Sequence, residues 1–351
     1  MKPKSNARGK AISPSAERNV TIEMVAQRAG VSLSTVSRII NGTATVSDDK
    51  KLAVLDAIEA LGFVPNPVAR GLAGGRTFSI GVVTQAIDSP FYGAALRGIE
   101  DELDPAGYSP LFVSAHWDAK TEARCISTLR SRRVDGIIVL TGRLSDHAIK
   151  TCAKHLPVVT TGRDLKAPGV FAMNFDNYGG CLLATRHLVE LGHRRIAFIT
   201  GDPLHPDSNE RFRGYRSGLD QAKIAYDPNL VAIGDYNLDS GLRAVERLSE
   251  GGQYFTAILA ANDQMATGAA LGLHRLGLRV PQDVSLVGFD DLPTSAFAIP
   301  PLTTVHQSAY EQGRLAAYAM LQLLNGEFPN VEVPKPRLVA RESSGRVRDF
   351  P

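Results

Sequence analysis

A short stretch of the chain, LSTVSR at residues 33–38, combines several hydroxyl groups with one arginine. Hydroxyl side chains donate and accept hydrogen bonds to phosphate oxygens and base edges, and a guanidinium can bind guanine through two atoms. An apolar side chain can contact the methyl group of thymine. On the exposed face of a helix, such a set suits the major groove of DNA; its members are Leu33, Ser34, Thr35, Ser37 and Arg38.

Three helices are expected to position this stretch. Thr21 can cap a first helix, and Gly30 can end it because glycine adopts a positive φ without strain. Ser32 can cap a second helix that continues to about Ile40, so the two helices would form a helix-turn-helix. Ser47 can cap a third, whose expected inward-facing side chains are Leu52, Leu55, Ile58 and Leu61. A helical hairpin that merely supports another part of the protein is the alternative.

The segment VPNPVARGLAGGR, residues 64–76, carries helix signals but is too short to form a stable helix alone. Pro65 disfavours helix before it, Asn66 can cap a helix, and Pro67 suits a first turn. A Gly-Gly pair then follows as a tether. We therefore expect a helix that forms only on binding a partner. A plain interdomain linker is the alternative.

Charge is distributed unevenly along the chain. Residues 1–76 carry eleven basic and six acidic side chains, a net charge of +5, whereas the remainder carries a net charge of −2. Residues 1–19 are polar and weakly basic and lack the apolar core of a signal peptide, so we expect a disordered basic tail. The basic bias therefore falls where a nucleic-acid contact is expected.

The sequence contains no motif typical of an α/β enzyme. It has no GxxxxGK[ST] phosphate loop, no GxSxG nucleophile turn and no HExxH zinc motif. We expect no enzymatic activity, no cofactor and no metal. The three cysteines, Cys125, Cys152 and Cys181, have no metal-ligand spacing and indicate a reduced, cytoplasmic protein. DNA binding would make it nucleoid-associated.

From Phe78 onward, short apolar strands alternate with helices, which predicts doubly wound parallel sheets. Expected strands are 79–83, 110–115, 136–140 and 157–162, then 195–201, 230–236, 256–263 and 285–291. Two such sets in tandem predict two lobes, with a ligand in the cleft beyond the carboxyl ends of the strands. The segment 302–307 is expected to cross back to the first lobe and give it a helix at 308–324, before 337–344 returns to the second.

Two stretches near the front, VTIEMVAQRAGVSLSTVSRIINGTATVS and VPNPVARGLAG, closely resemble the headpiece of the lac repressor family of bacterial transcription regulators. ANDQMA (261–266), VPQDVSLVGFDD (280–291) and PPLTTVHQ (300–307) resemble the core of that family, which is similar to periplasmic sugar-binding proteins. The resemblance extends to about residue 345. It implies an N-terminal all-α helix-turn-helix headpiece and an α/β periplasmic-binding-protein-like core of two doubly wound parallel-sheet lobes.

The resemblance also implies domain boundaries. A headpiece is expected at 20–64, a hinge helix and linker at 65–76, and an effector-binding and dimerisation core at 77–345. Within the core, the first lobe would comprise about 77–175 and 308–326. The second lobe would comprise about 176–305 and 328–345.

By the same resemblance, the second helix reads base pairs through Leu33, Ser34 and Arg38. Backbone or flanking contacts fall on Ser32, Thr35, Ser37 and Asn41. Paired hinge helices would enter the minor groove, where Leu72 wedges into the central base step and Asn66 and Ala69 make further contacts. A headpiece of this kind reads a palindrome as a homodimer. The chain ends in RESSGRVRDFP, without the heptads that make some relatives tetramers.

The family's effector contacts map onto nine positions, which are Phe91, Tyr92, His205, Asp207, Arg211, Tyr236, Asn262, Asp290 and Gln307. Structural alternatives stand beside them: Asp290 could cap a turn, and Phe91 and Tyr92 could pack between lobes. A lone loop histidine such as His205 is often not a ligand contact. Trp117, at the end of a strand, could stack on a ring or simply pack.

This set of side chains favours a sugar, sugar acid or sugar phosphate, because aromatic rings stack on a pyranose while charged groups bind its hydroxyls. Arg211 with His205 could hold an anionic group. We therefore expect a DNA-binding repressor switched by a carbohydrate-derived effector, with induction and co-repression both open. Alternatives are a purine- or nucleoside-responsive regulator, a regulator controlled by a protein partner, and an exported sugar-binding protein. The headpiece and the lack of a signal peptide disfavour the last.

Overall fold

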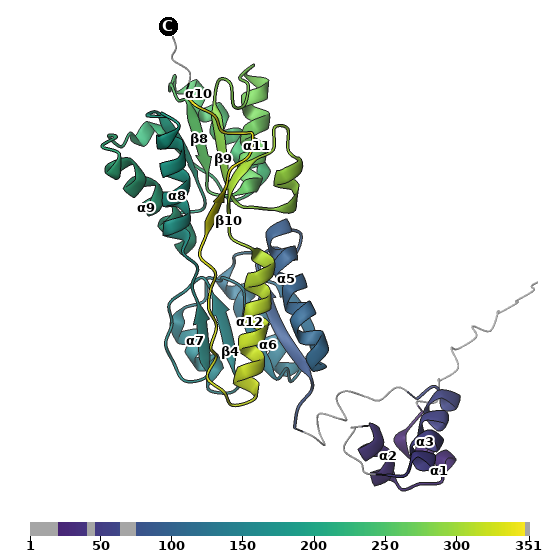
Figure 1. The fold of residues 1–351 in the computed structure, drawn as a ribbon. Coiled ribbons are helices and arrows are strands. Elements are labelled where there is room, and N and C mark those ends of the chain that lie inside the picture. Colours follow the sequence, from purple (N-terminus) through teal and green to yellow (C-terminus); the bar gives the residue numbers. More distant parts are fainter. Residues whose placement is uncertain (1–19, 41–45, 64–74, 348–351) are drawn as a thin grey trace, which may run out of the picture. The chain divides into compact units, whose positions relative to one another are not determined.

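The computed structural model describes residues 20–40, 46–63 and 75–347 (Figure 1). The chain divides into two units, one ending at Thr77 and one beginning at Phe78. The expected tail at 1–19 and the hinge segment through residue 74 lie outside the described residues. So do four of the expected DNA contacts, Asn41, Asn66, Ala69 and Leu72.

The described part of the first unit forms a helix-turn-helix followed by a third helix. Its helices are α1 (Ile22–Ala29), α2 (Leu33–Ile40) and α3 (Asp48–Leu61). Gly30 ends α1 with a φ of 64°, and its N–H donates to α1 carbonyl groups. The Ser32 hydroxyl accepts the N–H of Thr35 at 3.2 Å, which confirms Ser32 as the cap of α2. Val25, Val36 and Val54 are fully buried and join the three helices in one small core.

Three details of this unit differ from the expectation. Thr21 and Ser47 precede their helices, but neither side chain makes a capping hydrogen bond. Leu52 and Leu55 were expected to face inward, yet they are 59% and 47% exposed, whereas Val54 and Ala57 are buried. One residue corresponds to about 100° around a helix, so the inward stripe of α3 is rotated from the expected one.

The first lobe of the second unit is built on a parallel sheet of order β2-β1-β3-β4-β5. Its strands are β1 (Ser79–Thr84), β2 (Ser109–Ser114), β3 (Gly136–Val139), β4 (Val158–Thr161) and β5 (Val170–Met173). The intervening helices are α5 (Pro90–Leu103), α6 (Ala119–Ser131) and α7 (Asp146–Ala153). Strand β5 was not expected from the sequence. It is only four residues long and only its last residue is buried, so it lacks a strong apolar run.

The second lobe is built on a sheet of order β11-β10-β9-β8-β6-β7. Its strands are β6 (Ile196–Thr200), β7 (Val231–Ile233), β8 (Ala257–Ala260), β9 (Ser285–Asp290), β10 (Thr303–His306) and β11 (Arg337–Val339). Only β11 runs antiparallel to its neighbour in this sheet. The helices α8 (Asn177–Glu190), α9 (Pro206–Gln221), α10 (Leu238–Glu250) and α11 (Asp263–Arg275) flank it. The doubly wound fold class is therefore confirmed.

The chain passes between the lobes three times, after β5, after β10 and again before β11 (Figure 1). Residues 303–306 first form β10 in the second sheet, and the chain crosses only after them. It then enters α12 (Ala309–Leu324), which packs on α5 in the first lobe. The two helices approach closely because glycines meet backbone there: a Cβ at Gly98 would overlap the carbonyl oxygen of Tyr310.

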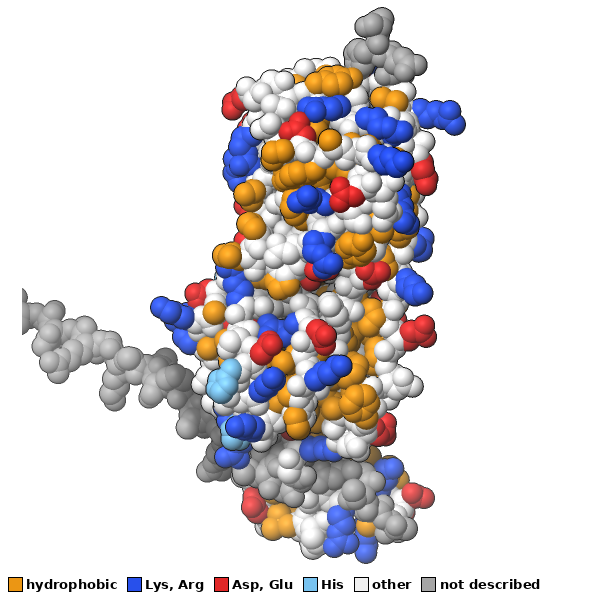
Figure 2. Space-filling view, turned by 90° about the vertical axis from the view of Figure 1, so that its left-hand side faces the viewer, with side chains coloured by type: hydrophobic (Ala, Val, Ile, Leu, Met, Phe, Trp, Pro, Cys, Tyr) orange, Lys and Arg blue, Asp and Glu red, His pale blue; other side chains and the backbone are white. Residues whose placement is uncertain are grey.

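One face of the second unit mixes both signs of charge. On the face shown in Figure 2, Lys and Arg side chains are interspersed with Asp and Glu, so this face presents no continuous patch of one sign. Within the described ranges, no helix combines the length and the apolar character that crossing a bilayer requires.

Candidate DNA-binding surface and ligand cavity

The first candidate site is the exposed side of α2. Ser32, Leu33, Ser34 and Arg38 are exposed, with Leu33 at 46%, whereas Val36 on the opposite side is fully buried. The Ser32 hydroxyl lies 2.9 Å from that of Ser34 and 2.8 Å from that of Thr35. This hydroxyl cluster orders the start of α2, where recognition helices contact bases. Thr35 and Ser37 are half-buried at the edge of the same surface.

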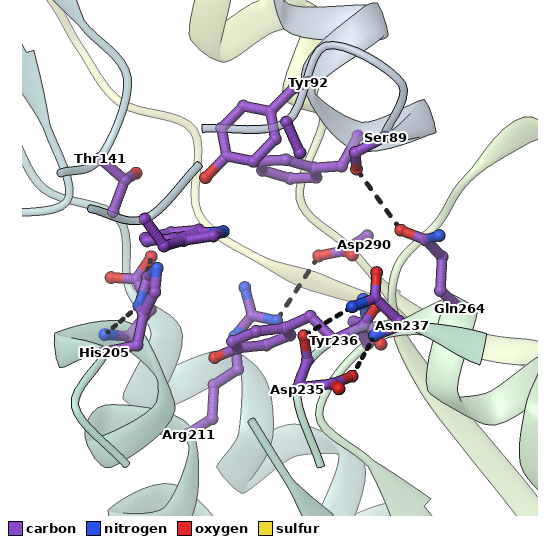
Figure 3. A pocket seen from close by; sticks show the side chains of 15 residues that line it. Ser89, Tyr92, Thr141, His205, Arg211, Asp235, Tyr236, Asn237, Gln264 and Asp290 are labelled. Carbon is purple, nitrogen blue, oxygen red and sulfur yellow. Dashed lines mark hydrogen bonds and ion pairs between the residues drawn. The ribbon is translucent and has the colours of Figure 1, made fainter. Parts of the chain in front are cut away.

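The second candidate site is a cavity of about 160 Å³ between the lobes (Figure 3). Ser89, Tyr92 and Thr141 of the first lobe face Arg211, Asp235 and Tyr236 of the second across it. Most lining residues follow the carboxyl ends of parallel strands, where ligands bind in such sheets. Eight of the nine expected effector contacts line this cavity, namely Phe91, Tyr92, His205, Asp207, Arg211, Tyr236, Asn262 and Asp290.

A buried arginine–aspartate pair occupies one side of the cavity. Arg211 projects from α9, where its Nε donates to Asn177 at 2.8 Å and its Nη1 donates to the Ala261 carbonyl. The same Nη1 lies 3.6 Å from Oδ1 of Asp290, at the end of β9. That oxygen is buried and has no hydrogen-bond partner among the described residues. Because a buried polar atom is normally hydrogen-bonded, Oδ1 is a ready acceptor for a ligand donor.

Burial dominates the electrostatics of this pair. It raises the pKa of Asp290 well above its ordinary value, although Arg211 opposes the shift. Burial alone would lower the pKa of Arg211, but the opposing electrostatic effects of Asp290, Tyr236, Asp207 and Cys181 together outweigh it, so that pKa is raised. Burial likewise raises the pKa of Asp207 to about 6, again against the attraction of Arg211. The cavity therefore holds two carboxyl groups that are poorly solvated.

His205 is held neutral in the unliganded cavity, so any help that it gives Arg211 in holding an anion comes from a hydrogen bond and not from charge. Burial and the nearby guanidinium of Arg211 lower the pKa of His205 to about 3. Its Nδ1 accepts the backbone N–H of Asp207 at 3.3 Å. The proton is therefore on Nε2, and the ring can donate one hydrogen bond from that atom.

Aromatic rings form a continuous wall from the first lobe to the second. Tyr92 and Trp117 have ring centroids 6.3 Å apart, and Trp117 and His205 are 4.4 Å apart. His205 in turn lies 5.5 Å from Tyr236. Phe91 packs edge-on against Tyr92 at 5.4 Å. Trp117 thus lines the cavity and also packs against the other lobe.

Two expected contacts have a different placement or a structural role. Asn262 lines the cavity, but its Oδ1 accepts the N–H of Met265 to cap α11 and its Nδ2 donates to the carbonyl of Tyr236. Both polar ends of this amide are therefore engaged by the protein. Gln307 does not line the cavity. It borders a separate hollow of about 250 Å³ beside the crossovers, with Phe175, Gln312 and Lys335.

Several lining residues were missed from the sequence, namely Ala86, Ser89, Thr141, Asp235, Asn237 and Gln264. Each lies in a loop or helix start that follows a strand. The rule that ligands bind at the carboxyl ends of parallel strands could have located these segments. It could not have chosen individual side chains within them, because that depends on how each loop turns.

Comparisons with known proteins agree with both parts of the fold. The model of "Bacterial regulatory proteins, lacI family" matches residues 21–66, and that of the periplasmic binding protein-like domain matches residues 185–344. The HTH-type transcriptional repressor PurR of Haemophilus influenzae is 32% identical over 333 residues, which cover 92% of this chain and 98% of that protein.

Solved structures show the same arrangement. The lac repressor dimer bound to operator and the anti-inducer ONPF matches with a TM-score of 0.82 and 29% identity, covering 93% of this chain and 100% of that one. The complex of the transcriptional regulator CelR with cellobiose matches with a TM-score of 0.69 and 34% identity, at the same coverage. Helix-turn-helix, two-lobed core and near full-length similarity lead to one conclusion: this chain belongs to the lacI family of bacterial regulatory proteins.

Proposed function

We propose that this protein is a homodimeric transcriptional repressor that binds palindromic operator DNA and is switched by a neutral carbohydrate bound between its lobes. The observation that carries the ligand part is the buried pair of Arg211 and Asp290, with its unpartnered carboxylate oxygen in the cavity. A hydroxyl group can donate to that oxygen and accept from a guanidinium at the same time.

Charge in the cavity supports a neutral ligand over a sugar acid or sugar phosphate. Arg211 is the one cationic side chain among the described lining residues, and its positive charge already interacts with the carboxyl groups of Asp207 and Asp290. Asp235 adds a third carboxyl group at the rim, 3.8 Å from Arg243. Because His205 is neutral, an anionic group would gain no unshared positive charge and would lose its hydration.

A purine or nucleoside is the second candidate, and the aromatic wall favours it. Tyr92, Trp117 and Tyr236 offer ring faces on which a base could stack. A nucleobase also presents donors and acceptors in one plane. The two candidates differ in how they use Asp290: hydroxyl groups of a sugar depend on its oxygens directly, whereas stacking does not.

Operator reading is assigned to the exposed side of α2. Leu33 would contact a thymine methyl group, Arg38 a guanine or phosphate, and Ser34 a base edge or phosphate. The hinge contacts Asn66, Ala69 and Leu72 remain part of the proposal by resemblance. Two-fold symmetry of a palindrome requires two headpieces, so a homodimer follows. Phe297 and Ile299, which are 85% and 97% exposed in the single chain, fit a surface that a partner subunit covers.

The test is thermal unfolding of the purified protein against a panel of neutral sugars, sugar acids, sugar phosphates, purines and nucleosides. A ligand at about a hundred times its Kd should stabilise the protein by about 2.7 kcal/mol. We expect the hit to be a neutral sugar and to be lost in Arg211→Lys and Asp290→Asn. Arg213→Lys is the matched control, because Arg213 lies on the same helix in an exposed pair with Glu210. A hit confined to purines would select the second candidate.

Fluorescence anisotropy with operator DNA then tests the regulatory part. We expect the operator to bind more tightly than unrelated DNA, with an affinity that falls as salt rises. The panel hit should change that affinity, and the direction of the change distinguishes induction from co-repression. Equal affinity for all duplexes, with or without ligand, would refute the proposed regulator.

A further inference from the structure

Two loops from different lobes meet beside the cavity. Arg143 lies in the loop after β3, and Asp202 lies in the loop after β6. Their side chains form an ion pair through Nη2 of Arg143 and Oδ2 of Asp202. Neither residue is among those that line the cavity. The pair therefore joins the lobes directly, without needing a ligand.

The loop that carries Arg143 is held firmly by its own lobe. Glu122 of α6 is completely buried, and its Oε2 accepts the backbone N–H of Arg143 at 2.8 Å. Arg163 donates to the carbonyl groups of Gly142 and Leu144, both at 2.9 Å. These bonds fix the position from which the guanidinium of Arg143 reaches the other lobe.

The partner loop is organised by Asp202 itself. Its Oδ1 accepts the N–H of Leu204 at 2.8 Å, and its carbonyl oxygen accepts the N–H of His205 at 2.9 Å. Asp202 therefore sets the path of the loop that carries His205 into the cavity. The Arg143 loop likewise carries Thr141, which lines the cavity from the other lobe.

Two weaker contacts accompany the pair. The rings of Trp117 and His205 meet across the lobes with centroids 4.4 Å apart. Ser89 donates from its hydroxyl to Oε1 of Gln264 at 3.4 Å. Ser89 precedes α5 and Gln264 lies in the first turn of α11, so the lobes touch at places other than the Arg143–Asp202 pair.

We propose that Arg143 and Asp202 form a clasp that holds the lobes closed over the cavity and positions Thr141 and His205 on its two walls. Opening the clasp admits and releases the ligand, so its strength sets the rate of exchange. The role of the clasp in ligand exchange rests on the proposed function, but the clasp itself does not depend on which molecule binds.

The exposure of the pair suits a contact that opens. The Arg143 and Asp202 side chains are 29% and 33% exposed, so water and salt screen their attraction. The Nε of Arg143 is buried and has no hydrogen-bond partner among the described residues. The guanidinium is thus incompletely satisfied in the closed arrangement, unlike that of a permanent structural pair.

The chain contains one tryptophan, Trp117, and its ring lies at the inter-lobe contact. Collisional quenching of its fluorescence by acrylamide therefore reports lobe opening in the full protein without ligand or DNA. We expect Arg143→Gln and Asp202→Asn each to increase the population of the open state about twofold to fivefold, as expected for a partly exposed ion pair. Asp202→Asn keeps a side-chain oxygen that can accept the N–H of Leu204, so the loop around residue 202 is preserved.

A double-mutant cycle identifies the pair as the cause. The double variant Arg143→Gln, Asp202→Asn should be quenched no more than either single variant, because the same contact is lost in each. Arg213→Gln, which removes the exposed pair with Glu210 within one lobe, should leave quenching unchanged. Unchanged quenching in both single variants, or additive effects in the double variant, would overturn the clasp.

Salt tests the same contact in the unaltered protein. Raising sodium chloride from about 0.1 M to about 1 M shortens the screening length from about 10 Å to about 3 Å. Quenching of Trp117 should rise in the wild type and stay constant in the double variant. Equal salt responses in the two proteins would also overturn the proposal. Neither readout involves the ligand panel, so its failure is separate from a failure of the proposed function.

Discussion

Replacing Asp207 with asparagine should stabilise the unliganded protein. Burial raises the pKa of this carboxyl group from 3.8 to about 6, against the attraction of Arg211. No hydrogen bond to the carboxylate offsets that burial among the interactions described for it, and the side chain is only 19% exposed. Asparagine has nearly the same shape and no charge to desolvate, so the substitution removes the penalty and keeps the packing.

The magnitude follows from the shift. A difference of about 2 pKa units corresponds to about 3 kcal/mol between the two protonation states. A carboxyl group with a raised pKa binds more protons in the folded state than in the unfolded state over the interval between the two pKa values. Its penalty is therefore absent below about pH 4, grows as the pH rises to about 6, and is constant above that.

Urea unfolding followed by circular dichroism measures this effect. Asp207→Asn should raise the free energy of unfolding by about 1–3 kcal/mol near pH 7.5, and the gain should vanish near pH 4. A gain that is independent of pH, or a loss near pH 7.5, would refute the reasoning. The same variant should bind the effector more weakly, because the substitution removes a charged acceptor from the cavity wall.

Asp263 provides a control of opposite sign. Burial also raises its pKa to about 6, but its carboxylate accepts three hydrogen bonds, from the hydroxyls of Ser295 and Thr304 and the N–H of Leu292. The amide nitrogen of asparagine cannot accept any of them. Asp263→Asn should therefore lower the free energy of unfolding near pH 7.5 by about 1–3 kcal/mol or more, because at least one buried donor is left unpaired.

Three further outcomes are expected. Arg38→Ala should weaken operator binding and reduce the dependence of affinity on salt, which anisotropy titrations at several salt concentrations measure. An unchanged affinity would show that α2 does not contact DNA through Arg38. Leu52→Glu should change stability by no more than about 0.5 kcal/mol, whereas Val54→Ala should cost about 1–3 kcal/mol in urea unfolding, because only Val54 is buried. On α5, Gly93→Ala should stabilise the protein by about 0.5–1 kcal/mol, because a Cβ at Gly93 meets open space. Gly98→Ala should destabilise it by about 1–3 kcal/mol or more, because a Cβ at Gly98 meets the backbone of α12. Thermal unfolding of the two variants checks the contrast.

The elements with strong periodic signals could be predicted from sequence. Strands such as β1 and β9 are long and buried, and the turn at Gly30 needs a positive φ that glycine supplies. Strand β5 could not, because it is short and mostly half-buried. The stripe of α3 was placed wrongly because Leu52 and Leu55 are apolar but exposed, while the small Ala57 faces inward.

The site was harder to predict than the fold, because roles depend on partners that are distant in sequence. His205 was expected to help Arg211 hold an anionic group, but burial and the charge of Arg211 keep its ring neutral, so it can offer a hydrogen bond and no charge. Gln307 follows β10 as the family pattern implies, yet it borders the hollow beside the crossovers and not the cavity. The pairing of Arg143 with Asp202 could not be predicted from the sequence, because the two residues are 59 positions apart and meet only where the lobes come together.

The three crossovers mean that neither lobe is a continuous piece of chain. Helix α12 completes the first lobe only after most of the second has been made, and β11 completes the second lobe only after α12. A chimera made by a single splice near residue 176 would therefore pair a first lobe from one parent with an α12 from the other. New effector specificities in such proteins should be easier to obtain by exchanging strand-end loops than by exchanging lobes. Each loop is one contiguous segment of the chain, whereas each lobe is built from separate segments.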